Sequence, residues 1–268
     1  MPKVKVSSPA LRAFASSCVL LAICAIGTPS KADGLAPQCI APSELTRLDG
    51  QLPRTASRIA AGSPLIIVAI GSSSTAGAGA SSPAHTYPSR LAVELKQLYP
   101  SIPMTVVNRG ANGEDAHEML ARFEEGVIAE KPDLVLWQVG TNSLLLDRPL
   151  QNAGMLIVDG LERLKKRGID VVLINSQYAP KVLAKPHLPM LRKLMAAIAA
   201  SANVPTFQRF ELMRYWRESA SMPFSAFLSP DQLHMNDWSY ACVAKLLAGS
   251  ISNAVARGAL SAHARAPN

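Results

Sequence analysis

Five short apolar runs, separated by stretches with helical periodicity, constrain the fold of this chain more than any other feature. The runs are rich in β-branched and aliphatic residues and cover residues 65–70, 104–108, 133–139, 170–175 and 204–208. Apolar residues recur at helical spacing between them, at Leu91, Leu95 and Leu98 and again at Leu150, Gly154, Ile157, Leu161 and Leu164. Continuous apolar strands that alternate with helices predict a parallel sheet covered by helices on both faces.

The first 32 residues have the composition of a secretory signal peptide. Lys3, Lys5 and Arg12 accompany an apolar run at 13–26, and no acidic residue occurs before Asp33. A helix of 14 residues, rising about 1.5 Å per residue, is too short to cross a hydrocarbon core of about 30 Å. We therefore expect cleavage after Ala32 and an exported product, periplasmic or secreted, with no stable membrane anchor.

Removal of this segment changes what the charge implies. The full chain of 268 residues has 27 basic and 19 acidic residues, a formal charge of +8. Residues 1–32 contain four of the basic residues and none of the acidic ones, which leaves 23 basic against 19 acidic residues, or +4. So small an excess gives no reason to expect nucleic acid as a partner.

Two cysteines, Cys39 and Cys242, remain after residue 32. An oxidising compartment favours a disulfide between them, and two buried thiols are the alternative. The sequence contains no repeat and no linker long enough to separate domains. We expect an N-terminal segment (33–62) packed on one domain (63–256), a flexible tail (257–268), and a monomer.

Parallel sheets place their functional residues in the loops that follow the carboxyl ends of the strands. The loop after the first run reads Gly-Ser-Ser-Ser-Thr-Ala-Gly-Ala-Gly (71–79). It lacks the third glycine of a dinucleotide fingerprint, the lysine of a P-loop and the last glycine of an α/β-hydrolase elbow. The loop therefore predicts a serine on a tight turn between strand and helix.

Three further polar stations follow the later runs. Residues 108–113 read Asn-Arg-Gly-Ala-Asn-Gly, residues 140–143 read Gly-Thr-Asn-Ser, and residues 231–234 read Asp-Gln-Leu-His. A catalytic base needs an orienting carboxylate, and Asp231 stands three residues before His234. None of His85, His117, His187 and His263 has an aspartate three residues before it.

Taken in order, the four stations resemble the blocks of the SGNH, or GDSL-type, esterase and lipase family. The block G-D-S-x-T corresponds to residues 71–75, the second-block glycine to Gly113, G-x-N-D to residues 140–143, and D-x-x-H to residues 231–234. The resemblance spans residues 65–255. The sequence departs from the pattern at Ser72 and Ser143, where the family has aspartates. Ser72 and Ser74 flank Ser73, and the Gly-x-Ser-x-Thr frame favours Ser73 as the nucleophile.

The resemblance implies a flavodoxin-like three-layer α/β/α sandwich and a serine esterase that forms an acyl-enzyme. Ser73 would be the nucleophile, His234 the base and Asp231 its orienting acid, with Ser73, Gly113 and Asn142 as oxyanion-hole donors. No cofactor and no metal are expected. The substrate would be a short-chain acyl ester or an O-acetylated glycan. An acyltransferase acting on a cell-envelope polysaccharide and a non-catalytic glycan-binding protein are the alternatives.

Overall fold

The computed structural model describes residues 1–5 and 38–263 of the chain, and the cleavage site expected after Ala32 lies outside these residues. Each of the five apolar runs contains a strand, all in one parallel sheet of order β2-β1-β3-β4-β5. The strands are β1 (Leu65–Gly71), β2 (Met104–Gly110), β3 (Leu134–Gln138), β4 (Asp170–Ile174) and β5 (Thr206–Phe207). The predicted parallel sheet is confirmed, although the last run contributes a strand of two residues.

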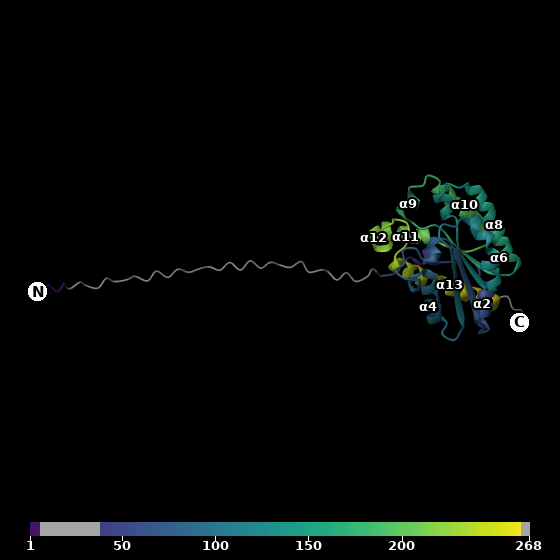
Figure 1. The fold of residues 1–268 in the computed structure, drawn as a ribbon. Helices are drawn as coiled ribbons and strands as arrows, with labels where there is room; N and C mark the ends of the chain where they lie inside the picture. The colour runs from purple at the N-terminus through teal and green to yellow at the C-terminus, as the bar shows by residue number, and fades with distance from the viewer. Residues whose placement is uncertain (6–37, 264–268) are drawn as a thin grey trace. The chain divides into compact units, whose positions relative to one another are not determined.

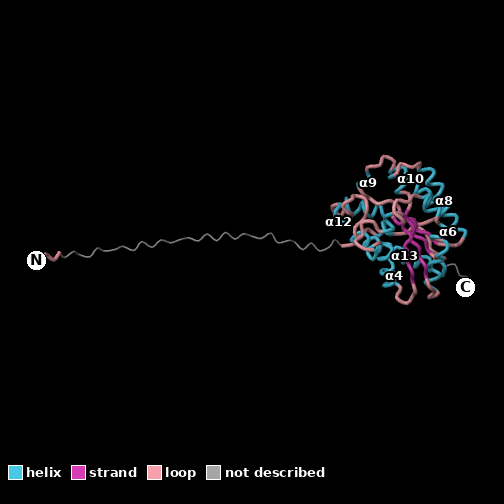
Figure 2. Tube along the Cα trace, viewed as in Figure 1, coloured by secondary structure: helices cyan, strands magenta, loops and turns pink. Residues whose placement is uncertain are grey.

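Helices cover the sheet on both faces (Figures 1 and 2). On one face, α4 (Tyr87–Leu98) packs against α13 (Asp237–His263). On the other face, α8 (Leu150–Lys166) packs against α5 (Ala116–Ala121) and α10 (Leu188–Ala202). Shorter helices connect these layers: α1 (Ser43–Thr46), α2 (Pro53–Ala60), α3 (Ser73–Ala76), α6 (Phe123–Gly126), α7 (Thr141–Leu145), α9 (Pro180–Leu183), α11 (Arg209–Glu218), α12 (Phe224–Phe227), and the 3₁₀ turns η1 (Pro83–His85) and η2 (Ile128–Glu130).

The strands β1, β3 and β4 are buried on both sides, which explains why their sequences are continuously apolar. The predicted apolar stripe of α8 is buried along its whole length, from Leu150 to Leu164. In α4, Leu91 and Leu95 are buried as expected, but Leu98 is 48% exposed. Leu98 is the last residue of α4, so its side chain lies beyond the face that the sheet covers. Among the described residues, no helix has both the length and the apolar character needed to cross a bilayer.

The segment before β1 packs on the amino-terminal ends of the strands. The backbone N–H and the hydroxyl of Thr55 in α2 both donate to Asp170 at the start of β4. Arg54 and Arg58, also in α2, donate to Asp133 just before β3, and Asp133 accepts a further bond from the Ile66 N–H. These side-chain contacts attach α2 to the start of β4 and to Asp133, whose carboxylate also binds β1.

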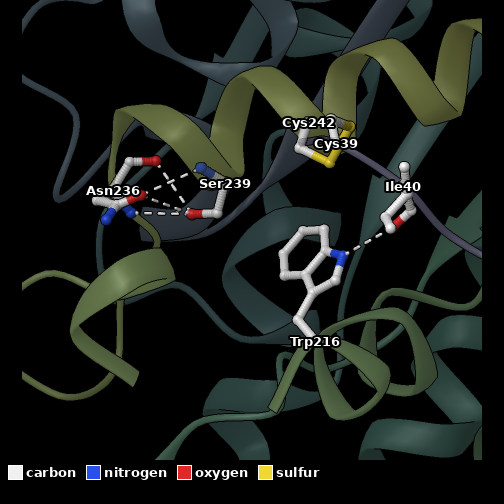
Figure 3. The surroundings of a disulfide bond; sticks show 6 residues. All are labelled: Cys39, Ile40, Trp216, Asn236, Ser239 and Cys242. Atoms are coloured by element: carbon white, nitrogen blue, oxygen red, sulfur yellow. Dashed lines mark hydrogen bonds between the residues drawn. A yellow bond between two sulfur atoms is a disulfide. The ribbon is translucent and has the colours of Figure 1, made fainter. Parts of the chain in front are cut away.

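A disulfide between Cys39 and Cys242 attaches the beginning of this segment to α13, as the cysteine count predicts (Figure 3). The Trp216 indole N–H donates to the Ile40 carbonyl beside it. At the other end of α13, the helix continues to His263, although a tail was expected from residue 257. The Arg257 guanidinium donates to the carbonyl of the buried Leu48, which ties this part of the helix to the same segment.

We expect the double variant Cys39→Ser/Cys242→Ser to be less stable to unfolding by about 3–5 kcal/mol, because the bridge closes a very long loop in the unfolded chain. Urea denaturation of oxidised wild type and of the variant measures the difference. Wild type in reducing agent should unfold like the variant. Equal midpoints for oxidised wild type and the variant would contradict the prediction.

Candidate active site

The loop after β1 is held by a buried amide rather than by an acid. The Ser72 N–H and hydroxyl donate to the Gln138 side-chain oxygen at 3.0 and 3.2 Å, and the Thr75 hydroxyl donates to it at 3.4 Å. Gln138 ends β3 and is 1% exposed. The neutral Gln138 therefore accepts the hydrogen bonds of Ser72 and Thr75. Position 72 of this loop is the one at which the family pattern has an aspartate.

The neighbouring strand approaches this loop closely. The Asn108 amide donates to the Thr75 carbonyl at 2.9 Å, and a Cβ at Gly110 would lie 2.1 Å from the Ala76 nitrogen. Glycine is required at position 110 because any side chain would displace the backbone of α3. The end of β2 and the helix that begins with Ser73 are thus fixed relative to one another.

The structure brings Ser73, His234 and Asp231 into one hydrogen-bonded line. His234 Nε2 lies 2.8 Å from Ser73 Oγ, and His234 Nδ1 lies 2.5 Å from Asp231 Oδ2. A carboxylate only accepts hydrogen bonds, so Nδ1 carries the proton and Nε2 is left to accept from the Ser73 hydroxyl. These residues come from opposite ends of the domain sequence and meet at the carboxyl edge of the sheet.

Asp231 is held in its ionised form. Burial raises the pKa of this carboxyl, but hydrogen bonds from the His234 N–H and ring, the Ser229 hydroxyl and the Leu233 N–H outweigh burial and hold the pKa well below its ordinary value. A carboxylate that is already bonded to its own loop keeps a fixed orientation toward the imidazole. The arrangement suits an acid that orients a base without taking its proton.

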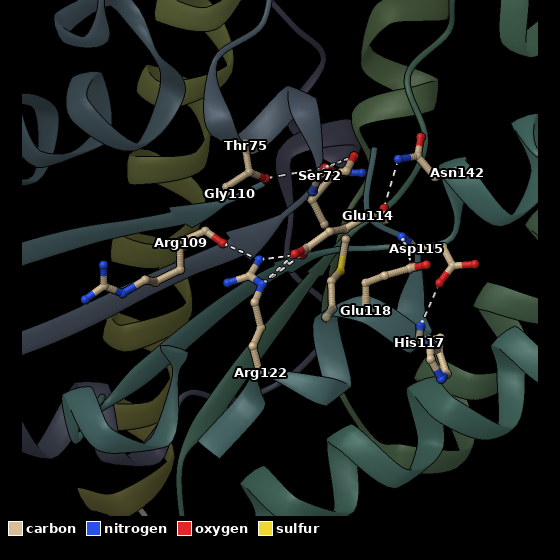
Figure 4. Close-up of polar contacts among 12 residues, drawn as sticks. Ser72, Thr75, Arg109, Gly110, Glu114, Asp115, His117, Glu118, Arg122 and Asn142 are labelled. Atoms are coloured by element: carbon tan, nitrogen blue, oxygen red, sulfur yellow. Dashed lines mark hydrogen bonds and ion pairs between the residues drawn. The ribbon is translucent and has the colours of Figure 1, made fainter. Parts of the chain in front are cut away.

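Three predicted donors follow the carboxyl ends of β1, β2 and β3, one after each strand. The Ser73 N–H opens α3 and the Gly113 N–H follows β2, and neither donates to another residue in the described part of the chain. Gly113 has a φ of +82°, a conformation that favours glycine. The Asn142 side-chain nitrogen in α7 donates to the Glu114 carbonyl at 2.9 Å, which leaves its second N–H available (Figure 4).

Ser143, the other departure from the family pattern, is fully buried. Its hydroxyl has no hydrogen-bond partner within residues 38–263. The side chain is buried in α7 and makes no hydrogen bond to Ser73, His234 or Asp231.

A second serine, histidine and aspartate meet at the start of α13. The Ser81 hydroxyl donates to Asp237 at 2.5 Å and contacts His85 Nδ1 at 2.6 Å, and the same histidine nitrogen lies 3.0 Å from Asp237. Because the hydroxyl bonds the carboxylate directly, the imidazole does not separate the two as it does at Ser73. Sequence spacing missed this cluster because Asp237 lies far along the chain from His85.

The strand order and this site define an α/β protein of the SGNH hydrolase type. The sequence model of the non-GDSL lipase-like family matches residues 38–257, and the chain therefore belongs to that family. The family's description agrees with Ser72 in the position of the GDSL aspartate.

Individual relatives match over shorter lengths or at low identity. An acetylxylan esterase of Geobacillus stearothermophilus is 42% identical over 50 residues, which are 19% of this chain and 23% of that protein. A solved two-domain esterase active on acetylated mannans has a TM-score of 0.65 at 22% identity and covers 78% of this chain and 56% of its own. The solved acetylxylan esterase Axe2 from Geobacillus stearothermophilus has a TM-score of 0.56 at 19% identity and covers 71% of this chain and 94% of its own. At these identities, the likeness of the solved structures establishes the fold.

Proposed function

We propose that this protein is an exported serine esterase that removes acyl groups, with O-acetyl groups on a glycan as its substrate class. The observation that carries the proposal is the line from Asp231 through His234 to Ser73, at 2.5 and 2.8 Å. In two solved structures of Axe2, the mutations called catalytic change an aspartate and a histidine three positions apart. Asp231 and His234 have the same spacing.

In the proposed mechanism, Ser73 attacks the ester carbonyl while His234 accepts the hydroxyl proton. Asp231 stabilises the imidazolium that forms. The tetrahedral oxyanion accepts hydrogen bonds from the Ser73 and Gly113 N–H groups and from the Asn142 amide. His234 then returns its proton to the departing alcohol, and water, activated by the same histidine, releases the acyl group from Ser73.

The Ser73→Ala and His234→Ala variants should lose at least ~10³-fold in kcat on 4-nitrophenyl acetate while keeping the unfolding midpoint of wild type. Ser81→Ala is the matched control, because it removes the serine of the second cluster and should keep activity within about 3-fold. Substantial turnover by Ser73→Ala would disprove the assignment. Labelling of wild type, but not of Ser73→Ala, by a fluorophosphonate would separate a catalyst from a non-catalytic binding protein.

Acyl transfer remains the second candidate function, because a sugar hydroxyl can replace water in the second half of the mechanism. Measurement of acetate release with and without an added glycan acceptor distinguishes the two. Release that needs no acceptor is expected for the hydrolase. Acylation of the acceptor without free acetate would instead favour the transferase.

A cavity of about 650 Å³ beside the loop of Asp231 and His234 supports a sugar as the alcohol part of the substrate. Its volume lies in the range of small-ligand sites, roughly 300–1,000 Å³. Phe224, Leu228 and Pro180 give it apolar walls, and Gln232 and Asn236 add amide groups. Apolar walls with a few hydrogen-bonding groups suit the faces and hydroxyls of a sugar ring.

We expect Phe224→Ala to raise KM for an acetylated xylo- or manno-oligosaccharide by roughly 10-fold, the loss of one ring contact worth about 1–1.5 kcal/mol. Its kcat/KM on 4-nitrophenyl acetate, which has no sugar, should stay within about 2-fold of wild type. Met190→Ala, an exposed change on α10, is the control. Equal losses on both substrates would argue against a sugar site in this cavity.

Export is supported by the basic and apolar composition of residues 1–32 and by the Cys39–Cys242 bridge, which forms in oxidising compartments. N-terminal sequencing of the protein from the culture medium or the periplasm of an expressing bacterium should find Asp33 as the first residue. A mature protein that retains residues 1–32 would contradict this part of the proposal.

A further inference from the structure

The loop between β2 and α5 carries the Gly113 N–H, but its backbone is held at few points. The Ala111 N–H donates to the Gly71 carbonyl at 2.9 Å, and no backbone hydrogen bond from Asn112 or Gly113 occurs within residues 38–263. Gly113 is exposed, and a Cβ there would meet nothing within 4 Å. Packing at Gly113 therefore does not position this N–H, so its position depends on contacts made by neighbouring residues.

Arg122, at the end of α5, supplies that contact through Glu114 (Figure 4). Its Nε lies 2.8 and 2.9 Å from the two Glu114 carboxylate oxygens, and its Nη2 lies 2.6 Å from one of them. The same Nη2 donates to the Arg109 carbonyl at 2.8 Å. The guanidinium thus joins Arg109, near the end of β2, to the residue directly after Gly113.

Both side chains are shielded from solvent, with 27% of Arg122 and 16% of Glu114 exposed. A bidentate arginine–carboxylate pair in such surroundings is stronger and more directional than a pair on the open surface. Its geometry fixes the position of Glu114, and with it the peptide that follows Gly113.

The Glu114 backbone also determines how Asn142 is oriented. Its carbonyl accepts from the Asn142 side-chain nitrogen at 2.9 Å. A carbonyl can only accept, so the nitrogen of the amide must face Glu114. The two N–H bonds of an amide lie in one plane at a fixed angle, so the first bond determines the direction of the second.

We propose that Arg122, acting through Glu114, is a positioning residue for the oxyanion hole. It holds the Gly113 N–H and the Asn142 amide in a fixed geometry relative to one another. The proposal rests on the proposed esterase function. Arg122 touches neither Ser73 nor His234, so it acts on the stabilisation of the oxyanion and leaves the nucleophile and the base in place.

The test compares kcat and KM for 4-nitrophenyl acetate in wild type, Arg122→Met, Arg122→Lys and Arg163→Met. Methionine keeps an unbranched side chain without the guanidinium, and kcat should fall roughly 10- to 100-fold with KM within about 3-fold. Lysine should recover part of the loss, because one ammonium can still pair with Glu114. The control Arg163→Met breaks the 2.6 Å pair with Asp159 on α8, outside the site, and should keep wild-type kcat.

A double-mutant cycle tests whether Arg122 acts through the oxyanion hole. The fold-loss of Arg122→Met/Asn142→Ala should be well below the product of the two single losses, because both changes affect the same donor. A loss equal to that product would overturn the proposal. So would wild-type kcat in a folded Arg122→Met.

Glu114→Gln provides a second variant in case Arg122→Met does not fold. It keeps the backbone carbonyl and removes the carboxylate that Arg122 binds, and it should lower kcat without a matching change in KM. Wild-type kcat in Glu114→Gln would overturn the proposal while leaving the esterase function intact. A wild-type protein that neither hydrolyses the ester nor reacts with a fluorophosphonate would overturn the esterase function and this assignment together.

Discussion

Strand β1 pairs in parallel with β2 on one side and β3 on the other, and its register decides which polar groups meet at the carboxyl ends of the strands. Gly71 lies opposite Gly110, and Ile70 lies opposite Trp137. The loop that carries Ser73 therefore begins between the ends of two strands. Gln138 contacts this loop from the side of β3, and Gly110 at the end of β2 lies against it from the other side. A shift in either register would separate the loop of Ser73 from one of these two supports.

Charge is distributed unevenly around this edge. The nucleophile loop is held by the neutral Gln138, so no carboxylate stands next to Ser73 at position 72. The ionised carboxylate is placed instead at Asp231, where hydrogen bonds from its own loop satisfy it. The Arg122–Glu114 pair carries no net charge and lies next to Gly113 and Asn142, the proposed oxyanion donors. An unpaired carboxylate near the proposed oxyanion would oppose its formation, so this distribution fits the proposed attack of Ser73 on an ester.

At the amino-terminal ends of the strands, side-chain contacts hold the N-terminal segment against the sheet. Burial raises the pKa of Asp133, but hydrogen bonds from Arg54, the Ile66 N–H and Arg58 outweigh burial and hold it below its ordinary value. Burial raises the pKa of Asp170 despite the bonds from Thr55. With the Cys39–Cys242 bridge, these contacts attach the N-terminal segment to the sheet and to α13. The chemistry and the attachment of this segment therefore lie at different ends of the same strands.

The sequence by itself determined the parallel sheet and its helical layers, and it predicted Ser73, His234 and Asp231, which the structure brings into hydrogen-bond contact. Continuous apolar runs and the short spacing from Asp231 to His234 are patterns of residues close together in the sequence. They can therefore be recognised without knowing how distant segments pack. The tertiary structure decided the contacts of Gln138, the last residue of β3, and of Arg122, and no motif marks either residue. Their partners lie on other loops, and a hydrogen bond between distant segments depends on strand register and loop geometry that one local pattern does not encode.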